Sequence, residues 1–236
     1  MVIDVCVVSR DRSLPKGLEY VPASHLIIET STPIGDARVA AISQVKTEVF
    51  AFIDDDVELT PDWYQKAMFH MNQGYAVVYS NPDRVGLGER FDRALSNQEE
   101  ISRLMRKGER FNTNLCLISR VTVVDWRPVN RRCYEDKDLG DWLLNSGHQV
   151  LLMPTDVKHR KTWWGIAKSA MWAGREYKCV CKHSSIEYLR RVFMPVKALV
   201  TRGLLPAIFI IWRNFFMILG MLDTDVRNRF RPEAIE

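Results

Sequence analysis

The fold is decided by the stretch IGDARVAAISQVKTEVFAFIDDDVEL, which runs from Ile34 to Leu59. Its first part, 34–45, has the length and composition of a helix that crosses between two strands. The apolar run Val49–Ile53 then predicts a buried strand, because it is short and rich in Val, Ile and Phe. Three consecutive carboxylates, Asp54–Asp56, follow where this strand ends. A helix, a buried strand and a polar strand end are typical of an α/β fold.

Segments on both sides extend the pattern. Thr60 and Pro61 predict the cap and first turn of a second helix that ends at Gly74. A third helix is predicted over 135–147, and the composition of 97–108 also favours a helix. Besides Val49–Ile53, the predicted strands are 2–9, 25–29, 75–79, 111–119, 121–126 and 149–154. The alternation predicts a Rossmann-type, mostly parallel sheet flanked by helices.

The composition is that of an ordinary globular protein. The chain has 236 residues, 47% hydrophobic and 26% charged, with a formal net charge of +4, which argues against a disordered chain or a collagen. The first residues lack the positive leader and long apolar core of a signal peptide. Five scattered cysteines fit reduced thiols better than a disulfide framework, and the segment CVCKH at 179–183 lacks the second pair of a zinc site. We therefore expect no signal peptide, no disulfides and no zinc.

Positive charge is concentrated late in the chain. From Lys158 to Arg202 there are eleven Lys and Arg against two acidic residues, a net of +9 that leaves −5 elsewhere. The apolar segment Leu204–Leu222 follows, and Arg213 within it disfavours a helix that spans a bilayer. We expect a peripheral or monotopic helix on an anionic membrane surface. A buried core helix or an oligomer interface is the alternative for this segment.

These features predict a division near residue 165. An α/β domain is expected over 1–165, with a donor half at about 1–80 and an acceptor half at about 81–165. A basic, helical, membrane-associating extension is expected over 166–236. A nucleic-acid partner is not expected, because the basic stretch contains no recognised binding module and runs straight into an apolar helix.

The carboxylates Asp54–Asp56 are the strongest chemical signal. In open α/β sheets, ligands collect beyond the carboxyl ends of the strands. Adjacent carboxylates repel one another, and a divalent metal shared with a diphosphate relieves that repulsion. The alternative is an acidic entry to the following helix, which the helix dipole favours. Taken alone, these residues leave both interpretations open.

Longer segments resemble the family-2 glycosyltransferases of GT-A fold. Residues 31–68 are similar to the core that binds the nucleotide-sugar, where a helix carrying an Ala-Arg pair leads into a strand and a DXD motif. Downstream, YEDKDLGDWLLNSG at 134–147 resembles the Glu-Asp motif, and VLLMPTDVKHR at 150–160 resembles the strand and histidine after it. The order, spacing and context of these segments match over roughly residues 2–160. The resemblance implies a metal-dependent, hexosyltransferase-like enzyme that uses Mn²⁺ or Mg²⁺ and a nucleotide-diphosphate sugar.

The resemblance also implies roles for single residues. Asp54 and Asp56 match the acids of the DXD motif and, with His159, would bind the metal. Asp136 matches the general base that deprotonates the acceptor hydroxyl, and Glu135 would orient it or bind the acceptor. One base and a direct attack imply inversion at the anomeric carbon. The residues expected to bind the donor are Ser9, Arg10, Glu29, Arg38, Asp54, Asp55, Arg160 and Lys161.

Apart from Asp54 and Asp55, the expected donor-binding residues fall into three groups. Glu29 stands where the family usually has Asp, and near it the first strand ends in Ser9 and Arg10, which leaves the nucleobase open, with uracil or guanine possible. Arg38 would approach the nucleotide or the diphosphate. Arg160 and Lys161 would neutralise the diphosphate leaving group.

The predicted general base, Asp136, indicates the type of acceptor. A hydroxyl needs a carboxylate to remove its proton, whereas a lipid phosphate is already an anion. With the basic stretch and the apolar segment, this predicts transfer to a hydroxyl of a membrane-associated acceptor, such as a lipid-linked glycan, at the cytoplasmic face of the membrane. The alternatives are a polyprenyl-phosphate glycosyltransferase and, from another class, a non-catalytic membrane-bound scaffold. The C-terminal helices are also candidates for self-association.

Overall fold

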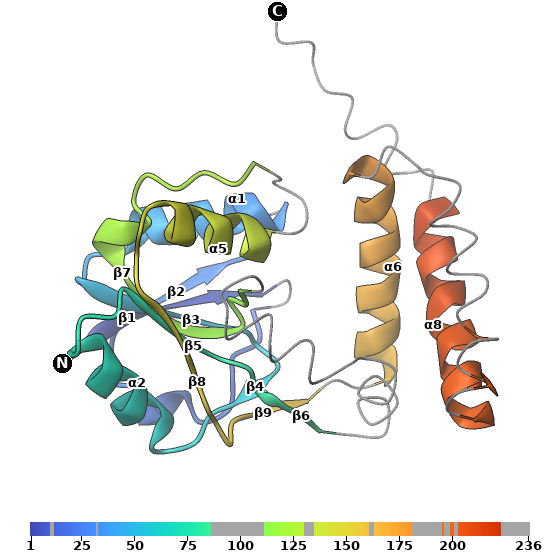
Figure 1. Cartoon of the computed structure of the whole chain (residues 1–236), viewed down its shortest axis with the longest axis horizontal. Coiled ribbons are helices and arrows are strands. Elements are labelled where there is room, and N and C mark those ends of the chain that lie inside the picture. Colours follow the sequence, from blue (N-terminus) through green and yellow to red (C-terminus); the bar gives the residue numbers. More distant parts are fainter. Residues whose placement is uncertain are drawn as a thin grey trace, which may run out of the picture. The chain divides into compact units, whose positions relative to one another are not determined.

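The structure is a computed structural model of the 236-residue chain (Figure 1). It describes residues 1–9, 12–31, 33–85, 111–129, 135–160, 163–180, 195, 199–200 and 203–222. These residues fall into two compact units. The sheet unit comprises Met1–Val85 and the described part of 97–160, and the helical unit comprises the helices α6 (Trp163–Val180) and α8 (Leu204–Leu222).

The sheet unit is built on a six-stranded sheet with the strand order β2-β1-β3-β7-β5-β8. Strand β1 pairs in parallel with β2 and β3, and β5 pairs in parallel with β8, whereas β7 is antiparallel to β3 and β5. The predicted mostly parallel sheet is confirmed, with β7 as its antiparallel strand. The strands are β1 (Ile3–Val8), β2 (Ala23–Glu29), β3 (Val49–Ile53), β5 (Val77–Ser80), β7 (Leu115–Ser119) and β8 (Val150–Met153).

Helices cover both faces of this sheet (Figure 1). Because side chains alternate along a strand, Ile53 of β3 packs with α2 (Trp63–Met71) on one face, while Phe52 packs with α1 (Ile34–Gln44) and α5 (Glu135–Asn145) on the other. Both side chains are buried. The two apolar layers fix the sheet between its helices, so the polar ends of its strands are held in place.

One buried carboxylate in β1 has a structural role. Asp4 is fully buried, and it accepts hydrogen bonds from the backbone N–H groups of Lys46 (2.6 Å) and Thr47 (3.2 Å). Its other oxygen lies 2.9 Å from Nδ1 of His25 on β2. These contacts lower the pKa of Asp4 although burial alone would raise it. Asp4 thus ties β1 and β2 to the turn between α1 and β3.

A second, small sheet lies where β3 ends. Its strands are β4 (Val57–Glu58), β9 (Lys158–Arg160) and β6 (Asp83–Val85), in the order β4-β9-β6. Strand β4 is antiparallel to β9 and pairs Val57 with His159. This pairing brings His159 next to the three carboxylates, from about 100 positions away in the sequence.

One predicted strand is absent, and other predicted elements begin or end at different residues, such as 111–119, of which only Leu115–Ser119 is a strand. The predicted strand over 121–126 is instead a 3-10 helix (η2, Arg120–Thr122) followed by a turn. Val123 and Trp126 are buried while Val121 is 79% exposed, and a spacing of three between buried residues suits a helical turn rather than a strand. Helix α2 begins at Trp63 rather than at Pro61, because the Trp63 N–H first closes a turn onto the carbonyl of Thr60. The predicted helix over 97–108 lies outside the described residues.

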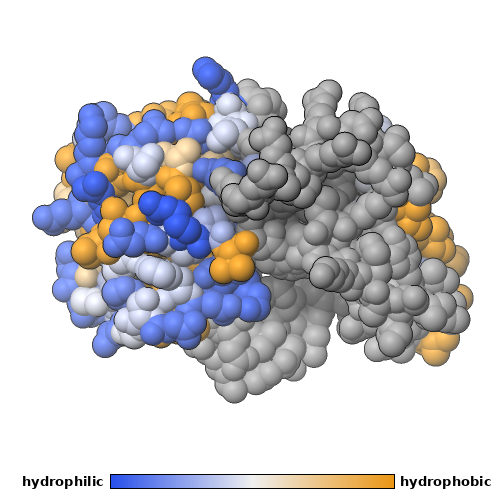
Figure 2. Space-filling model, turned by 90° about the horizontal axis from the view of Figure 1, so that it is seen from above, coloured by the Kyte–Doolittle hydropathy of each residue, from blue (hydrophilic) through white to orange (hydrophobic). Residues whose placement is uncertain are grey.

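The helical unit is held by close contact between two backbones. A Cβ added at Gly174 of α6 would lie 2.0 Å from the carbonyl oxygen of Met217, and one at Gly220 of α8 would lie 2.0 Å from that of Met171. Only glycine fits at such positions. Helix α8 has the bounds of the predicted apolar segment, and its exposed side chains form part of the hydrophobic surface in Figure 2. Within the described residues, no helix combines the length and apolarity needed to cross a bilayer.

Candidate active site

The three carboxylates sit in a tight turn between β3 and β4. The N–H of Asp54 donates to the carbonyl of Asn114 (2.8 Å), just before β7. The N–H of Val57 then closes the turn onto the carbonyl of Asp54 (3.3 Å). The turn is therefore anchored at the edge where β1 and β3 end, which is where ligands bind in open α/β sheets.

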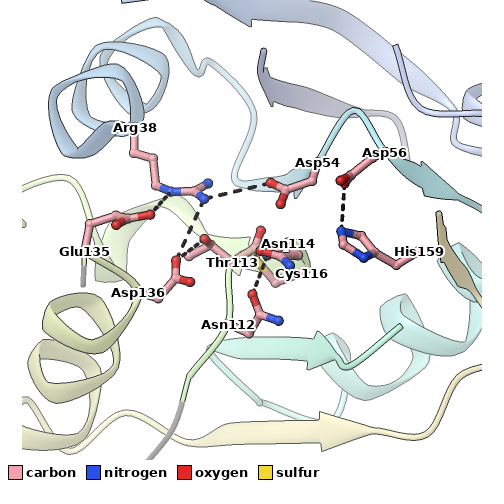
Figure 3. A network of polar contacts seen from close by, with 10 residues as sticks. All are labelled: Arg38, Asp54, Asp56, Asn112, Thr113, Asn114, Cys116, Glu135, Asp136 and His159. Atoms are coloured by element: carbon pink, nitrogen blue, oxygen red, sulfur yellow. Dashed lines mark hydrogen bonds and ion pairs between the residues drawn. The ribbon is translucent and has the colours of Figure 1, made fainter. Parts of the chain in front are cut away.

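Asp54, Asp56 and His159 form a candidate metal centre (Figure 3). One ligand atom from each lies within 4.8 Å of the others, and Nε2 of His159 lies 2.8 Å from Oδ1 of Asp56. His159 is 3% exposed, so the small sheet holds its ring in place. Two carboxylates and an imidazole suit Mn²⁺, and the carboxylates also suit Mg²⁺. The residues present therefore fit the predicted metal.

The surroundings of Asp54, in the candidate metal centre, disfavour its ionised form. Burial raises its pKa to about 6, and Asp56 and Asp136 add to this effect, while Arg38 opposes it. A divalent cation among these groups would favour the ionised carboxylate.

Arg38 of α1 is the buried centre of the polar network in Figure 3. It is 2% exposed and its guanidinium lies 5.1 Å from the ring of Phe52. Its Nε donates to Glu135 (3.2 Å), and its Nη2 lies 3.8 Å from Asp136 and 3.9 Å from Asp54. Burial alone would lower the pKa of Arg38, but the three carboxylates raise it above its ordinary value. The Arg38 side chain thus links Asp54, in the candidate metal centre, to Asp136, the predicted base.

Glu135 and Asp136 open helix α5 with different exposures. Glu135 is 5% exposed, and burial followed by the charge of Asp136 raises its pKa to about 7, against the effect of Arg38. Asp136 is more open, with 31% of its side chain exposed, and it accepts a hydrogen bond from the Thr113 hydroxyl. Of this pair, Asp136 is therefore the carboxylate that a substrate can reach.

Replacing Glu135 by Gln is expected to flatten the pH dependence of stability. The folded protein holds the Glu135 proton up to about pH 7, whereas an unfolded chain releases it near 4.5, so the free energy of unfolding falls as pH rises through this window. The effect is roughly 1 to 3 kcal/mol. Gln keeps an acceptor oxygen for Arg38 but has no such proton to lose.

Urea denaturation at several pH values measures this effect. Relative to the wild type, the unfolding free energy of Glu135→Gln should rise between about pH 4.5 and pH 8. A difference between the two proteins that stays constant over this range would show that the buried acid titrates normally.

The other predicted donor-binding residues are distributed as follows. Ser9 is buried at the end of β1, its N–H donates to the carbonyl of Glu29, and its hydroxyl lies 3.2 Å from that of Ser13. Ser13 in turn donates to Asp55 (2.9 Å). The carboxylate of Glu29 accepts hydrogen bonds from Ser31 and Gln44. Arg160 lies in β9 beside the metal centre, while its side chain, Arg10 and Lys161 lie outside the described residues.

The strand ends thus bring together most of the predicted site, together with three residues that the sequence analysis missed. Ser13 links the end of β1 to Asp55, Asn114 anchors Asp54, and Thr113 contacts Asp136. The only sequence signal for the last two was their place in FNTN, directly before an apolar strand.

The Rossmann-type sheet, with a metal-ligand cluster and an acidic pair meeting beyond its strand ends, defines a sugar transferase of GT-A type. A family model, Glycosyl transferase family 2, matches residues 9–132, more than half of the chain. The protein therefore belongs to glycosyl transferase family 2, which confirms the predicted family, fold and class of enzyme.

Solved structures agree on the fold. Glucosyl-3-phosphoglycerate synthase from Mycobacterium tuberculosis, in complex with Mg²⁺ and uridine-diphosphate, is 13% identical with a TM-score of 0.51, over 75% of this chain and 77% of that one. The same enzyme with Mn²⁺, uridine-diphosphate and phosphoglyceric acid is 12% identical with a TM-score of 0.52, over 77% and 80% of the chains. No curated protein sequence matches significantly.

Proposed function

We propose that the protein transfers a sugar from a nucleotide-diphosphate sugar to a hydroxyl group of a membrane-associated acceptor, with inversion at the anomeric carbon. The observation that carries this proposal is the contact of Arg38 with both Asp54 and Asp136, at 3.9 and 3.8 Å. The Arg38 side chain therefore lies between Asp54, on the metal side, and Asp136, the proposed base. A donor held by the metal and an acceptor held by Asp136 would meet beside this side chain.

In this proposal each residue has a defined task. Asp54, Asp56 and His159 hold the cation, which when bound neutralises charge on the diphosphate leaving group. The carboxylate of Asp136 takes the proton of the acceptor hydroxyl as its oxygen bonds to the anomeric carbon. The bond from that carbon to the diphosphate breaks, and its electron pair leaves with the diphosphate. One displacement from the opposite side inverts the configuration.

UDP is the first nucleotide to test. The Mycobacterium tuberculosis enzyme of similar fold is described in complex with uridine-diphosphate and Mg²⁺ or Mn²⁺. In this chain, Ser9 and Glu29 lie at the ends of β1 and β2, and Ser13 lies in the segment after β1, where a base or ribose would be held.

A membrane surface is proposed as the place of the acceptor, on the cytoplasmic side. The segment Lys158–Arg202 carries a net charge of +9, which would attract anionic lipid headgroups. Helix α8 exposes one apolar stripe at helical spacing, with side chains 47 to 63% exposed, a pattern typical of helices that lie in the interface. This stripe consists of Leu204, Ile208, Ile211, Phe215 and Ile218.

Transfer in the presence of vesicles tests this function. The protein is incubated with Mn²⁺ and a radiolabelled UDP-sugar, in turn with anionic vesicles containing membrane lipid extract, with vesicles containing undecaprenyl phosphate, and with soluble phosphoglycerate. We expect Mn²⁺-dependent label in the extract-containing vesicles.

Other results of this experiment would indicate a different function or a different partner. Label on undecaprenyl phosphate alone would identify a polyprenyl-phosphate glycosyltransferase, and label on phosphoglycerate alone would remove the membrane acceptor. Binding of nucleotide without any transfer would favour the non-catalytic scaffold. A second copy of the chain bound through the α8 stripe, seen as a dimer without vesicles, would replace the membrane as its partner.

A further inference from the structure

The short segment before β7 connects the two halves of the site. The side-chain oxygen of Asn112 accepts a hydrogen bond from the backbone N–H of Asn114 (3.0 Å), which forms a turn in this segment. The carbonyl of Asn114 accepts the N–H of Asp54 (2.8 Å), and the hydroxyl of Thr113 donates to Oδ1 of Asp136. Adjacent residues therefore hold the metal-side acid and the predicted base.

Thr113 is completely buried, while its partner Asp136 is partly exposed. A buried hydroxyl that donates to a carboxylate forms a charge-assisted hydrogen bond, stronger than one between neutral groups. Because Thr113 is buried, it does not offer a surface to a substrate. Its effect must act through Asp136.

The two oxygens of Asp136 have different surroundings (Figure 3). Oδ1 receives the Thr113 hydroxyl and lies 3.8 Å from Nη2 of Arg38. Within the part of the chain that the structure describes, Oδ2 has no hydrogen bond. Since the side chain is 31% exposed, Oδ2 is the atom with room for an incoming hydroxyl.

We propose that Thr113 is a positioning residue that makes Oδ2 of Asp136 the proton-accepting atom. The Thr113 hydroxyl keeps its own proton and fixes Oδ1, so the carboxylate cannot turn away from the acceptor. The inference rests on the proposed role of Asp136 as the base.

Among the described residues, the charged groups around Asp136 are Arg38 on α1, the neighbouring Glu135 on α5, and Asp54 at the end of β3. All three remain in a variant of Thr113. A change in turnover in that variant is therefore attributable to the lost hydroxyl.

Thr113→Val, which has nearly the same shape, tests the inference against Thr113→Ser, which keeps the hydroxyl. We expect Val to lower kcat about 10- to 100-fold, with an unchanged KM for the UDP-sugar. Ser should restore most of kcat. Thr122→Val is the matched control, since that buried hydroxyl donates to the carbonyl of Ser119, outside the polar network.

The outcomes separate this inference from the proposed function. A wild type that transfers sugar, with a Thr113→Val variant of unchanged kcat, would overturn the positioning role alone. An equal loss in the Ser and Val variants would overturn it too, because shape and not the hydroxyl would then matter. Thermal unfolding and binding of UDP with Mn²⁺ establish that the Val variant is folded with an intact donor site. A wild type without any transfer would instead overturn the proposed function.

Discussion

Asp136→Asn is expected to lower the rate of sugar transfer by about 10²- to 10⁴-fold, the usual contribution of a general base. Asn has the same shape as Asp and still accepts a hydrogen bond from Thr113, but it cannot take a proton from a hydroxyl. Asp136 is not one of the clustered metal ligands, so binding of the nucleotide with its metal should change by no more than a few-fold. Single-turnover rates and calorimetric binding measure the two quantities separately.

Asp141→Asn is the matched control for this substitution. Asp141 lies on the same helix, is about half exposed, and pairs on the surface with Lys137. It should leave the rate of transfer unchanged. Substantial activity in Asp136→Asn would contradict its role as the base and favour a phosphate acceptor, which needs no base.

Asp56→Ala and His159→Ala are expected to weaken binding of Mn²⁺ by more than about 100-fold. Loss even of a residue that only orients a metal ligand typically costs 10- to 100-fold in affinity, and these two side chains are themselves proposed ligands. Their ligand atoms are already 2.8 Å apart. Titration of Mn²⁺ into the protein without nucleotide, followed by calorimetry, measures the effect.

Asp62→Asn controls for the loss of one negative charge. Asp62 stands just before α2, is half exposed, and pairs with Lys66 on the surface. It should bind Mn²⁺ like the wild type. Equal affinities in Asp56→Ala and the wild type would exclude the Asp54, Asp56 and His159 cluster as the metal centre.

Local patterns in the sequence were sufficient for most of the sheet and its covering helices. Val49–Ile53 and Leu115–Ser119 are buried strands, since a short apolar run can be recognised without knowledge of its partners. The same patterns failed at 121–126. There the run of Val and Thr suggests a strand, but buried Val123 and Trp126 follow the spacing of a helical turn.

Long-range contacts in the site were less accessible to sequence reasoning. The resemblance groups His159 with Asp54 and Asp56, but it does not show how the ring reaches them. His159 lies beside Asp56 because the two-residue strand β4 pairs with β9, and so short a strand has no pattern of its own. Thr113 and Asp136 lie 23 positions apart, and nothing in either segment indicates the other. Arg38 was expected near the donor, whereas the structure also shows it bonded to Glu135, which is 97 positions away.

The proposed function requires that this chain binds a nucleotide through a metal held by Asp54, Asp56 and His159. Calorimetric titration of UDP into the wild type and Asp56→Ala, each with Mn²⁺ and with EDTA, tests it most directly. Binding is predicted for the wild type with Mn²⁺, and its loss is predicted both with EDTA and in Asp56→Ala. Binding of UDP that is equally strong in all four titrations, or absent in all four with folded protein, would contradict the claim.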